Sequence, residues 1–276
     1  MSVAGSIFVI SSQVVSGLVG LKAAMPAMRA LGYETVTLPT TLLAAHPAAY
    51  PQNGPPAGGA LPPEQMVDIA DWLLKAGALD KCEAILTGYL PSAAHVDAAA
   101  QIVARLKAQQ PHLLYCCDPI CGDDGALYLP PEVASGIADR LLPLADMATP
   151  NLFELQQLSE TKALDTTEAI VAAARKLEVA HMVITSAPAA PGRIASLAIG
   201  DDILRCETAC APQAPSGMGD FFAALYLGLH LAEDPKALGI TAATLAQMAA
   251  RNMETATLPH GPVQLAAAAI TDKISL

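Results

Sequence analysis

The feature that most constrains the fold is an alternation of two kinds of apolar segment along the chain. Short runs rich in Val, Ile and Leu are followed by longer Ala- and Leu-rich stretches with helical periodicity. In residues 93–109, for example, Val96, Ile102 and Leu106 fall on one face of a helix, and Arg105 points away from it. This alternation is typical of βαβ units, so we predict an α/β fold whose mostly parallel sheet is covered by helices on both faces.

The predicted strands are Ser6–Ser12, Glu34–Thr37, Ala84–Thr87, Leu113–Cys117, Met147–Thr149, Met182–Thr185 and Ile194–Ile199. The predicted helices are Gly20–Ala30, Pro63–Lys75, Ala93–Gln109, Pro131–Leu142, Leu152–Ser159, Thr166–Leu177, Asp220–Leu231 and Thr241–Thr255.

One connection is unlike the others. Residues 46–63 contain six prolines and three glycines and have little periodicity, and this is too long for an ordinary connection between a strand and a helix. The segment is either a flap over a site or a boundary between domains. We favour a single domain over residues 1–276 with a flap at about residues 44–63.

The composition limits the partners of the chain. Hydrophobic residues make up 53% and charged residues 15%, which excludes intrinsic disorder. The formal net charge of −11 repels phosphate backbones, so we expect no nucleic-acid partner. An anionic nucleotide would need local backbone amides or a metal ion.

The N-terminal segment has no charged side chain before Lys22, as in a membrane-spanning or signal segment. It has no basic n-region, and polar residues such as Ser11, Gln13 and Ser16 interrupt it. We therefore expect a cytoplasmic protein without a membrane partner. The six cysteines lack the paired C-x-x-C spacing of a zinc site, which indicates reduced, mostly buried thiols.

A glycine-rich turn leads directly into an apolar helix at Gly217-Met218-Gly219-Asp220. The glycines allow backbone N–H groups to approach an anion, and the helix N-terminus adds partial positive charge. Asp220 is either a plain N-cap or a general base that takes the proton of an attacking hydroxyl. The segment completes neither a G-x-G-x-x-G fingerprint, since Phe222 replaces the third glycine, nor a Walker A loop.

Polar residues follow the predicted strands, and the carboxyl ends of parallel strands meet at one edge of a sheet. These residues are Ser12, Tyr89, Asp118, Asp123, Asp124, Thr149, Glu154, Thr185 and Ser186. The carboxylates suit Mg²⁺, which is bound by oxygen atoms and bridges substrate phosphates. The alternative for Asp123-Asp124-Gly125 is a polar turn with no ligand.

The order of these motifs resembles the ribokinase superfamily and, within it, the pyridoxal kinases. Thr149-Pro-Asn-Leu-Phe-Glu154 is similar to the T-P-N-x-x-E element, and residues 217–220 are similar to the G-x-G-D motif. The segments 86–89 and 117–123 are closer to pyridoxal kinases than to sugar kinases. The resemblance implies a ribokinase-like three-layer α/β/α sandwich.

The resemblance also implies a function and roles for individual residues. The reaction would be ATP-dependent phosphorylation of the 5′-hydroxymethyl group of pyridoxal, with Mg²⁺, in a homodimer. Asp220 would be the base, and Gly217 and Gly219 would form the anion hole. Asp118, Asp123 and Glu154 would bind Mg²⁺ and the triphosphate. The ATP site would be lined by Asp118, Thr149, Glu154, Thr185, Ser186 and Met218. The substrate would be bound by Ser12, His46, Tyr89 and Asp220.

The chain departs from the pyridoxal kinase pattern on the substrate side. Ala45-His46-Pro47 stands where these kinases usually read Asn-His-Thr, and Gln13 follows Ser12 where they have His. The alternatives are therefore a kinase for hydroxymethylpyrimidine or a B6-binding protein without turnover. The sequence leaves open the preferred vitamer and any need for a monovalent cation.

Overall fold

The structure, a computed structural model, describes residues 5–211, 215–250, 265–266, 269 and 271–274. A sheet in the order β12-β11-β10-β9-β8-β5-β4-β1-β2-β3 runs through the molecule. The pairs from β2 to β9 are parallel, and β3 and β10–β12 add antiparallel strands at the two edges. The strands of this sheet are β1 (Ser6–Ser16), β2 (Glu34–Ala45), β3 (Gly58–Ala60), β4 (Cys82–Thr87), β5 (Leu114–Cys117), β8 (Met147–Ala148), β9 (His181–Ala187), β10 (Arg193–Ile199), β11 (Ile203–Ala209) and β12 (Thr271–Ile274).

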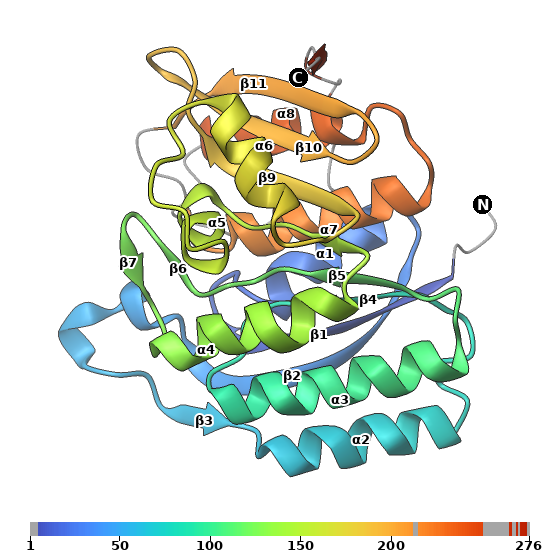
Figure 1. Cartoon of the computed structure of the whole chain (residues 1–276). Coiled ribbons are helices and arrows are strands. Elements are labelled where there is room, and N and C mark those ends of the chain that lie inside the picture. Colours follow the sequence, from blue (N-terminus) through green and yellow to red (C-terminus); the bar gives the residue numbers. More distant parts are fainter. Residues whose placement is uncertain (1–4, 212–214, 251–264, 267–268, 270, 275–276) are drawn as a thin grey trace.

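Helices cover both faces of the sheet, so the predicted α/β sandwich with a mostly parallel sheet is confirmed (Figure 1). One face carries α2 (Pro63–Lys75), α3 (Ala93–Gln109), α4 (Pro131–Gly136), α5 (Leu152–Leu158) and α6 (Thr167–Arg175). The other face carries α1 (Leu21–Ala30), α7 (Met218–Leu231) and α8 (Ala237–Ala250).

Each face has its own hydrophobic core because side chains alternate along a strand. On β1, Phe8 and Ile10 pack into the core beneath α2 to α6, whereas Ile7 and Val9 pack against α1 and α7. All four are fully buried, which explains why the strand reads as a continuous apolar run.

Two N-terminal strands are longer than predicted. The register between β1 and β2 shifts at Ser11, and the pairing then continues to Ser16 and Ala45. The predicted second strand ends at Thr37, whereas β2 continues through Pro39 to Ala45, because proline is tolerated at a bulge. Two 3₁₀ turns, Pro47–Ala49 and Pro51–Asn53, follow β2, and β3 then pairs back onto it.

Other predictions needed correction. The helix expected at Pro131–Leu142 is α4 followed by a π turn, Ile137–Leu141, and a 3₁₀ turn, Leu142–Leu144. Helix α8 begins four residues before the predicted Thr241, and the predicted end at Thr255 lies outside the described residues. The strands β3, β11 and β12 and the hairpin of β6 (Gly122–Asp123) and β7 (Ala126–Leu127) were not predicted.

The cysteines agree with the prediction of reduced thiols. All six are free, five are buried, and only Cys210 is exposed. Within the described residues, no helix has the length and apolar character needed to cross a membrane.

Candidate active site

The N-terminus of α7 is built on a glycine with a left-handed backbone. Gly217 has φ +90°, and a Cβ atom there would overlap the carbonyl oxygen of Leu18. Only glycine therefore allows the loop before α1 to pack this closely against α7. At Gly219, by contrast, a Cβ atom would meet nothing within 4 Å. Among the described residues, the space beside Gly219 at this helix end is therefore open, as an anion site requires.

Asp220 joins this helix end to the loop before α1. Its Oδ2 accepts a hydrogen bond of 2.9 Å from the Gly20 backbone N–H, across 200 residues of sequence. Gly20, at φ +57°, packs so closely on Ser12 that a Cβ atom would overlap its carbonyl oxygen and Oγ. Burial raises the pKa of Asp220 to about 6, and the hydrogen bond from Gly20 opposes this rise. Ser12, Gly20 and Asp220 are therefore neighbours.

Asp118 lies at the end of β5 and is buried. It accepts a hydrogen bond of 2.9 Å from Thr149 Oγ1, which follows β8. Burial raises the pKa of Asp118 well above its usual range, and the negative charges of Glu154 and Asp220 raise it further. Three predicted site residues from three separate elements thus share one electrostatic environment.

Glu154 is buried in the first turn of α5 and forms a capping box with Asn151. Its Oε2 accepts from the Asn151 N–H at 2.9 Å, and its Oε1 accepts from the Cys121 N–H at 3.0 Å. Burial raises the pKa of Glu154 to about 8, although these backbone donors oppose the rise. Glu154 thereby connects α5 to the loop after Asp118.

Asp123 lies on β6, and Asp124-Gly125 form the two-residue turn to β7. Both turn residues have positive φ, 49° and 79°, as expected for an Asp-Gly hairpin. Asp124 therefore lies in a turn, as the second interpretation of this segment predicts. Asp123 is half-buried, and its charge raises the pKa of the nearby Glu154.

These carboxyl groups form an acidic region in which the described residues provide no basic partner. None of the ion pairs among the described residues includes Asp118, Asp123, Glu154 or Asp220. Among the residues that the structure describes, no group of three His, Cys, Asp or Glu side chains is close enough together to hold a metal ion without other ligands. The oxygen-only donor set fits Mg²⁺ that keeps waters and phosphate oxygens among its ligands.

The predicted ATP-side residues lie at the ends of neighbouring elements. Thr185, near the end of β9, bridges to Asn151, and its N–H donates to Pro150 O at 3.0 Å. Ser186 follows it, exposed and with φ +58°. Met218 is half-buried as the first residue of α7.

Tyr89 is held by backbone contacts on both sides. Its N–H donates to Ser11 Oγ at 3.2 Å, and its carbonyl accepts from Thr40 Oγ1 at 2.8 Å.

His46 is half-buried in front of the first 3₁₀ turn, where its Nδ1 accepts from the Ala48 N–H at 3.3 Å. In the described part of the chain, no hydrogen bond joins His46 to another predicted site residue.

Three residues of this region were not among the predicted site residues. Gly20 donates to Asp220, Asn151 caps α5, and Ser11 holds Tyr89. Gly20 could have been found as a glycine directly before an apolar helix, and Asn151 as the start of an N-x-x-E capping box. Nothing in the sequence distinguishes Ser11 from its neighbours.

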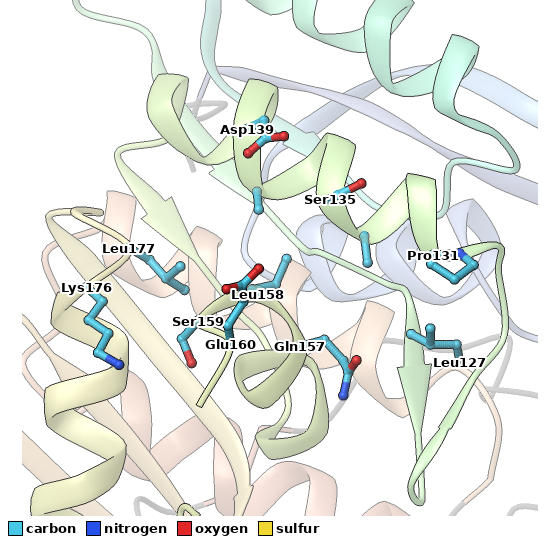
Figure 2. A pocket seen from close by; sticks show the side chains of 12 residues that line it. Leu127, Pro131, Ser135, Asp139, Gln157, Leu158, Ser159, Glu160, Lys176 and Leu177 are labelled. Atoms are coloured by element: carbon cyan, nitrogen blue, oxygen red, sulfur yellow. The ribbon is translucent and has the colours of Figure 1, made fainter. Parts of the chain in front are cut away.

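A cavity of about 430 Å³ lies elsewhere, among β7, α4, α5 and α6 (Figure 2). Leu127, Ala134 and Leu158 line it together with the charged residues Asp139, Glu160 and Lys176. No predicted site residue lines this cavity, so it is separate from the candidate active site.

Comparison with known proteins identifies the family. Residues 16–262 match the model of the phosphomethylpyrimidine kinase family. A pyridoxine/pyridoxal/pyridoxamine kinase of Bordetella bronchiseptica is 36% identical over 83% of this chain and 82% of its own length. The chain belongs to the pyridoxal kinase family of the ribokinase superfamily. It is a kinase.

Two further pyridoxal kinases support this family assignment. Pyridoxal kinase PdxY of Deinococcus radiodurans is 32% identical over 82% of this chain and 79% of its own length. The structure of the Leishmania donovani pyridoxal kinase with ADP and pyridoxamine superposes with a TM-score of 0.84 at 25% identity, covering 98% of this chain and all of the other (100%). The ribokinase-like fold that the motifs imply is therefore confirmed.

Proposed function

We propose that this pyridoxal kinase transfers the γ-phosphoryl group of ATP to the 5′-hydroxyl of pyridoxal, with pyridoxine and pyridoxamine as further substrates. The observation that carries the proposal is the position of Asp220. Its carboxylate lies at the N-terminus of α7, is held by the Gly20 N–H and neighbours Ser12. A base and an anion-binding helix end are thus in one place, as phosphoryl transfer to an alcohol requires.

In the proposed reaction, Asp220 accepts the proton of the 5′-hydroxyl while that oxygen forms a bond to the γ-phosphorus. The bond from the γ-phosphorus to the β–γ bridging oxygen breaks, and ADP leaves with that electron pair. The N–H groups at Gly217 and Gly219 donate to the phosphoryl oxygens during transfer. With a pKa of about 6, Asp220 is mostly ionised at neutral pH. This pKa is also close to the pH at which the enzyme works, which is the best range for a general base.

Asp118, Asp123 and Glu154 are the residues proposed to hold Mg²⁺, directly or through water. When bound, Mg²⁺ would neutralise triphosphate charge. Both Glu154 oxygens already accept backbone hydrogen bonds, which favours contact through water for this residue. Thr149, Thr185, Ser186 and Met218 are proposed to line the ATP side, and the acidic region supports a cation-dependent mode of nucleotide binding.

Ser12, Tyr89 and His46 are the proposed contacts to the pyridine ring. Ser12 is adjacent to Asp220 through Gly20, which supports its place on the acceptor side. Ala45 and Pro47 on either side of His46 cannot offer side-chain hydrogen bonds to the ring. We therefore propose a vitamer preference that differs from that of kinases with Asn-His-Thr in the flap.

The proposal treats residues 1–276 as one kinase domain that acts in the cytoplasm as a homodimer. The family resemblance supports the dimer, and the reduced cysteines are consistent with a cytoplasmic location. A requirement for a monovalent cation stays open and is tested by replacing K⁺ with Na⁺ in the assay.

The decisive experiment measures ATP consumption with Mg²⁺ and each of pyridoxal, pyridoxine, pyridoxamine and hydroxymethylpyrimidine. Asp220→Asn should lower kcat about 10²- to 10⁴-fold because a neutral amide cannot accept the proton. The matched control is Asp201→Asn, an exposed acid in the turn between β10 and β11, which should keep the parent rate.

The same panel decides between the alternatives. Turnover of hydroxymethylpyrimidine alone would replace the proposed substrate, and the family description of the matching model makes this the second candidate. Binding of pyridoxal without ATP consumption would show a B6-binding protein without turnover. Equal rates for the parent and Asp220→Asn would refute the role of Asp220.

A further inference from the structure

His95 is a buried histidine outside the residues assigned to the reaction. It lies in the first turn of α3 and is only 5% exposed. Its Nε2 is 2.8 Å from the carbonyl oxygen of Leu61, the residue that follows β3 at the C-terminal end of the flap. We propose that His95 is a positioning residue that holds this end of the flap and thereby controls affinity for the B6 vitamer. The inference rests on the proposed function.

The hydrogen bonds determine the tautomer of His95. A carbonyl oxygen can only accept, so Nε2 carries the proton that is donated to Leu61. In the neutral imidazole, Nδ1 then accepts from the hydroxyl of Ser92, at 2.7 Å. Both ring nitrogens are satisfied, and the ring is held in one orientation.

Ser92 gives an independent indication that this orientation matters. It is the N-cap residue of α3, and serine in this position normally accepts a hydrogen bond from a backbone amide of the first turn. Here its side chain makes no capping bond and contacts His95 instead. A good capping residue is thus used to orient the histidine rather than to stabilise the helix end.

Leu61 connects His95 to the loop that carries Tyr89. The Leu61 N–H donates to Thr40 O at 2.9 Å, and the Thr40 hydroxyl donates to Tyr89 O at 2.8 Å. Thr40, at the centre of this chain of contacts, is fully buried. One residue of β2 therefore joins the end of the flap to a proposed contact of the pyridine ring.

The position of His95 predicts an effect on one substrate only. The contacts run from α3 through Leu61 and Thr40 to Tyr89. By contrast, Thr149 follows β8, and Thr185 and Ser186 belong to β9, on the other side of β5. In Figure 1, β3 and α3 lie at the side of the molecule away from β9 and β10. Loosening the flap end should thus raise KM for the vitamer without changing KM for ATP.

The test compares steady-state kinetics of His95→Leu, His95→Gln and Ser92→Ala. Leu removes the donor to Leu61, whereas the amide of Gln retains an N–H that reaches it. We expect His95→Leu to raise KM for pyridoxal about tenfold, equivalent to about 1.4 kcal/mol, with KM for ATP unchanged. His95→Gln should restore most of the affinity, and Ser92→Ala should have an intermediate effect. His112→Leu, in an exposed turn beyond the other end of α3, is the control.

Hydrogen exchange provides a readout that does not depend on turnover. His95→Leu should accelerate exchange of the amides at residues 41–61, including the Leu61 amide bonded to Thr40, and leave α7 unchanged. Unchanged KM for pyridoxal together with unchanged exchange would overturn the inference, as would equal increases in both KM values. If the parent protein phosphorylates no vitamer, the proposed function fails, and exchange still decides whether His95 holds the flap.

Discussion

At the scale of single residues, the pKa of Asp220 makes a direct prediction. The proposed base works only when it is ionised, and its pKa of about 6 lies above the usual range for aspartate because of burial. Activity should therefore rise with pH through about 6 and become constant near neutral pH. A profile of kcat/KM for pyridoxal from pH 5 to 8 measures this. A profile that is flat across this range, or that falls as pH increases, would exclude Asp220 as the base.

Gly20 provides a second prediction at this scale. In Gly20→Ala, the new Cβ would overlap the Ser12 carbonyl, and a residue at φ +57° is strained for any side chain. We expect a loss of about 1–3 kcal/mol in the free energy of unfolding, together with a large loss of activity because the N–H bonded to Asp220 moves. Urea unfolding and initial rates measure the two effects.

The control for this substitution is Gly32→Ala. Gly32 also has positive φ, 89°, but a Cβ atom there would meet nothing within 4 Å. The Gly32→Ala variant should lose stability because its positive φ is strained for alanine, but it should retain activity. Loss of activity in both variants would indicate that backbone strain alone, and not the contact between Gly20 and Asp220, is responsible.

Candidate site residues could be selected from the sequence where they directly follow a recognisable strand or glycine-rich turn. Asp118, Thr149 and Asp220 could be selected because the strands and the glycine-rich turn are visible in the sequence. The contact from Gly20 to Asp220 could not be derived in this way, since it depends on how α1 and α7 pack. The two backbone bonds of Glu154 likewise join segments that only the folded chain brings together.

At the scale of elements, β9 and α7 are joined by a histidine. His181 Nε2 lies 2.7 Å from the Tyr226 hydroxyl, and the His181 and His230 rings are 4.8 Å apart. Burial, and to a smaller extent the nearby His230, together lower the pKa of His181 to about 4. Because an unfolded histidine has a pKa of about 6.5, the unfolded state binds more protons between these values. This residue thus makes stability rise with pH from about 4 to about 6.5.

Replacing His181 with Leu should remove that slope. The difference in free energy of unfolding between the parent and the variant should grow by up to about 3 kcal/mol from pH 4 to 6.5, as about 1.4 kcal/mol applies per pKa unit. Chemical unfolding at several pH values measures it, with Tyr226→Phe as a variant that keeps the histidine. A constant difference between parent and His181→Leu would contradict the lowered pKa.

Elements were predicted best where both faces of a strand are buried. The parallel strands β1, β4, β5 and β9 each contain a short buried apolar run, such as Ile7–Ile10 in β1, so the local sequence reveals them. Strand β11 contains Arg205 and Glu207, and β3 consists of two glycines and an alanine. These strands exist because a neighbour supplies hydrogen bonds, which a local pattern does not contain.

At the scale of the whole molecule, the net charge of −11 opposes the binding of an anionic nucleotide. Salt screens this repulsion, since the Debye length falls from about 30 Å at 0.01 M to about 8 Å at 0.15 M. We expect KM for ATP to fall about two- to threefold over this range at constant free Mg²⁺. Pyridoxal, with little net charge, is the control substrate and its KM should change less. A rise of KM for ATP with salt would show that local attraction outweighs the overall charge.

The hydrogen bond between Gly20 and Asp220 also has a consequence for biosynthesis. Its two partners are 200 residues apart, and the acceptor belongs to the last third of the chain. A polypeptide still emerging from the ribosome can form the β1–α1–β2 unit early, but it carries no catalytic base opposite that unit until α7 has been translated and released from the exit tunnel. Enzyme activity should therefore appear late in synthesis, and premature termination before Asp220 should yield products that contain much of the sheet and no kinase.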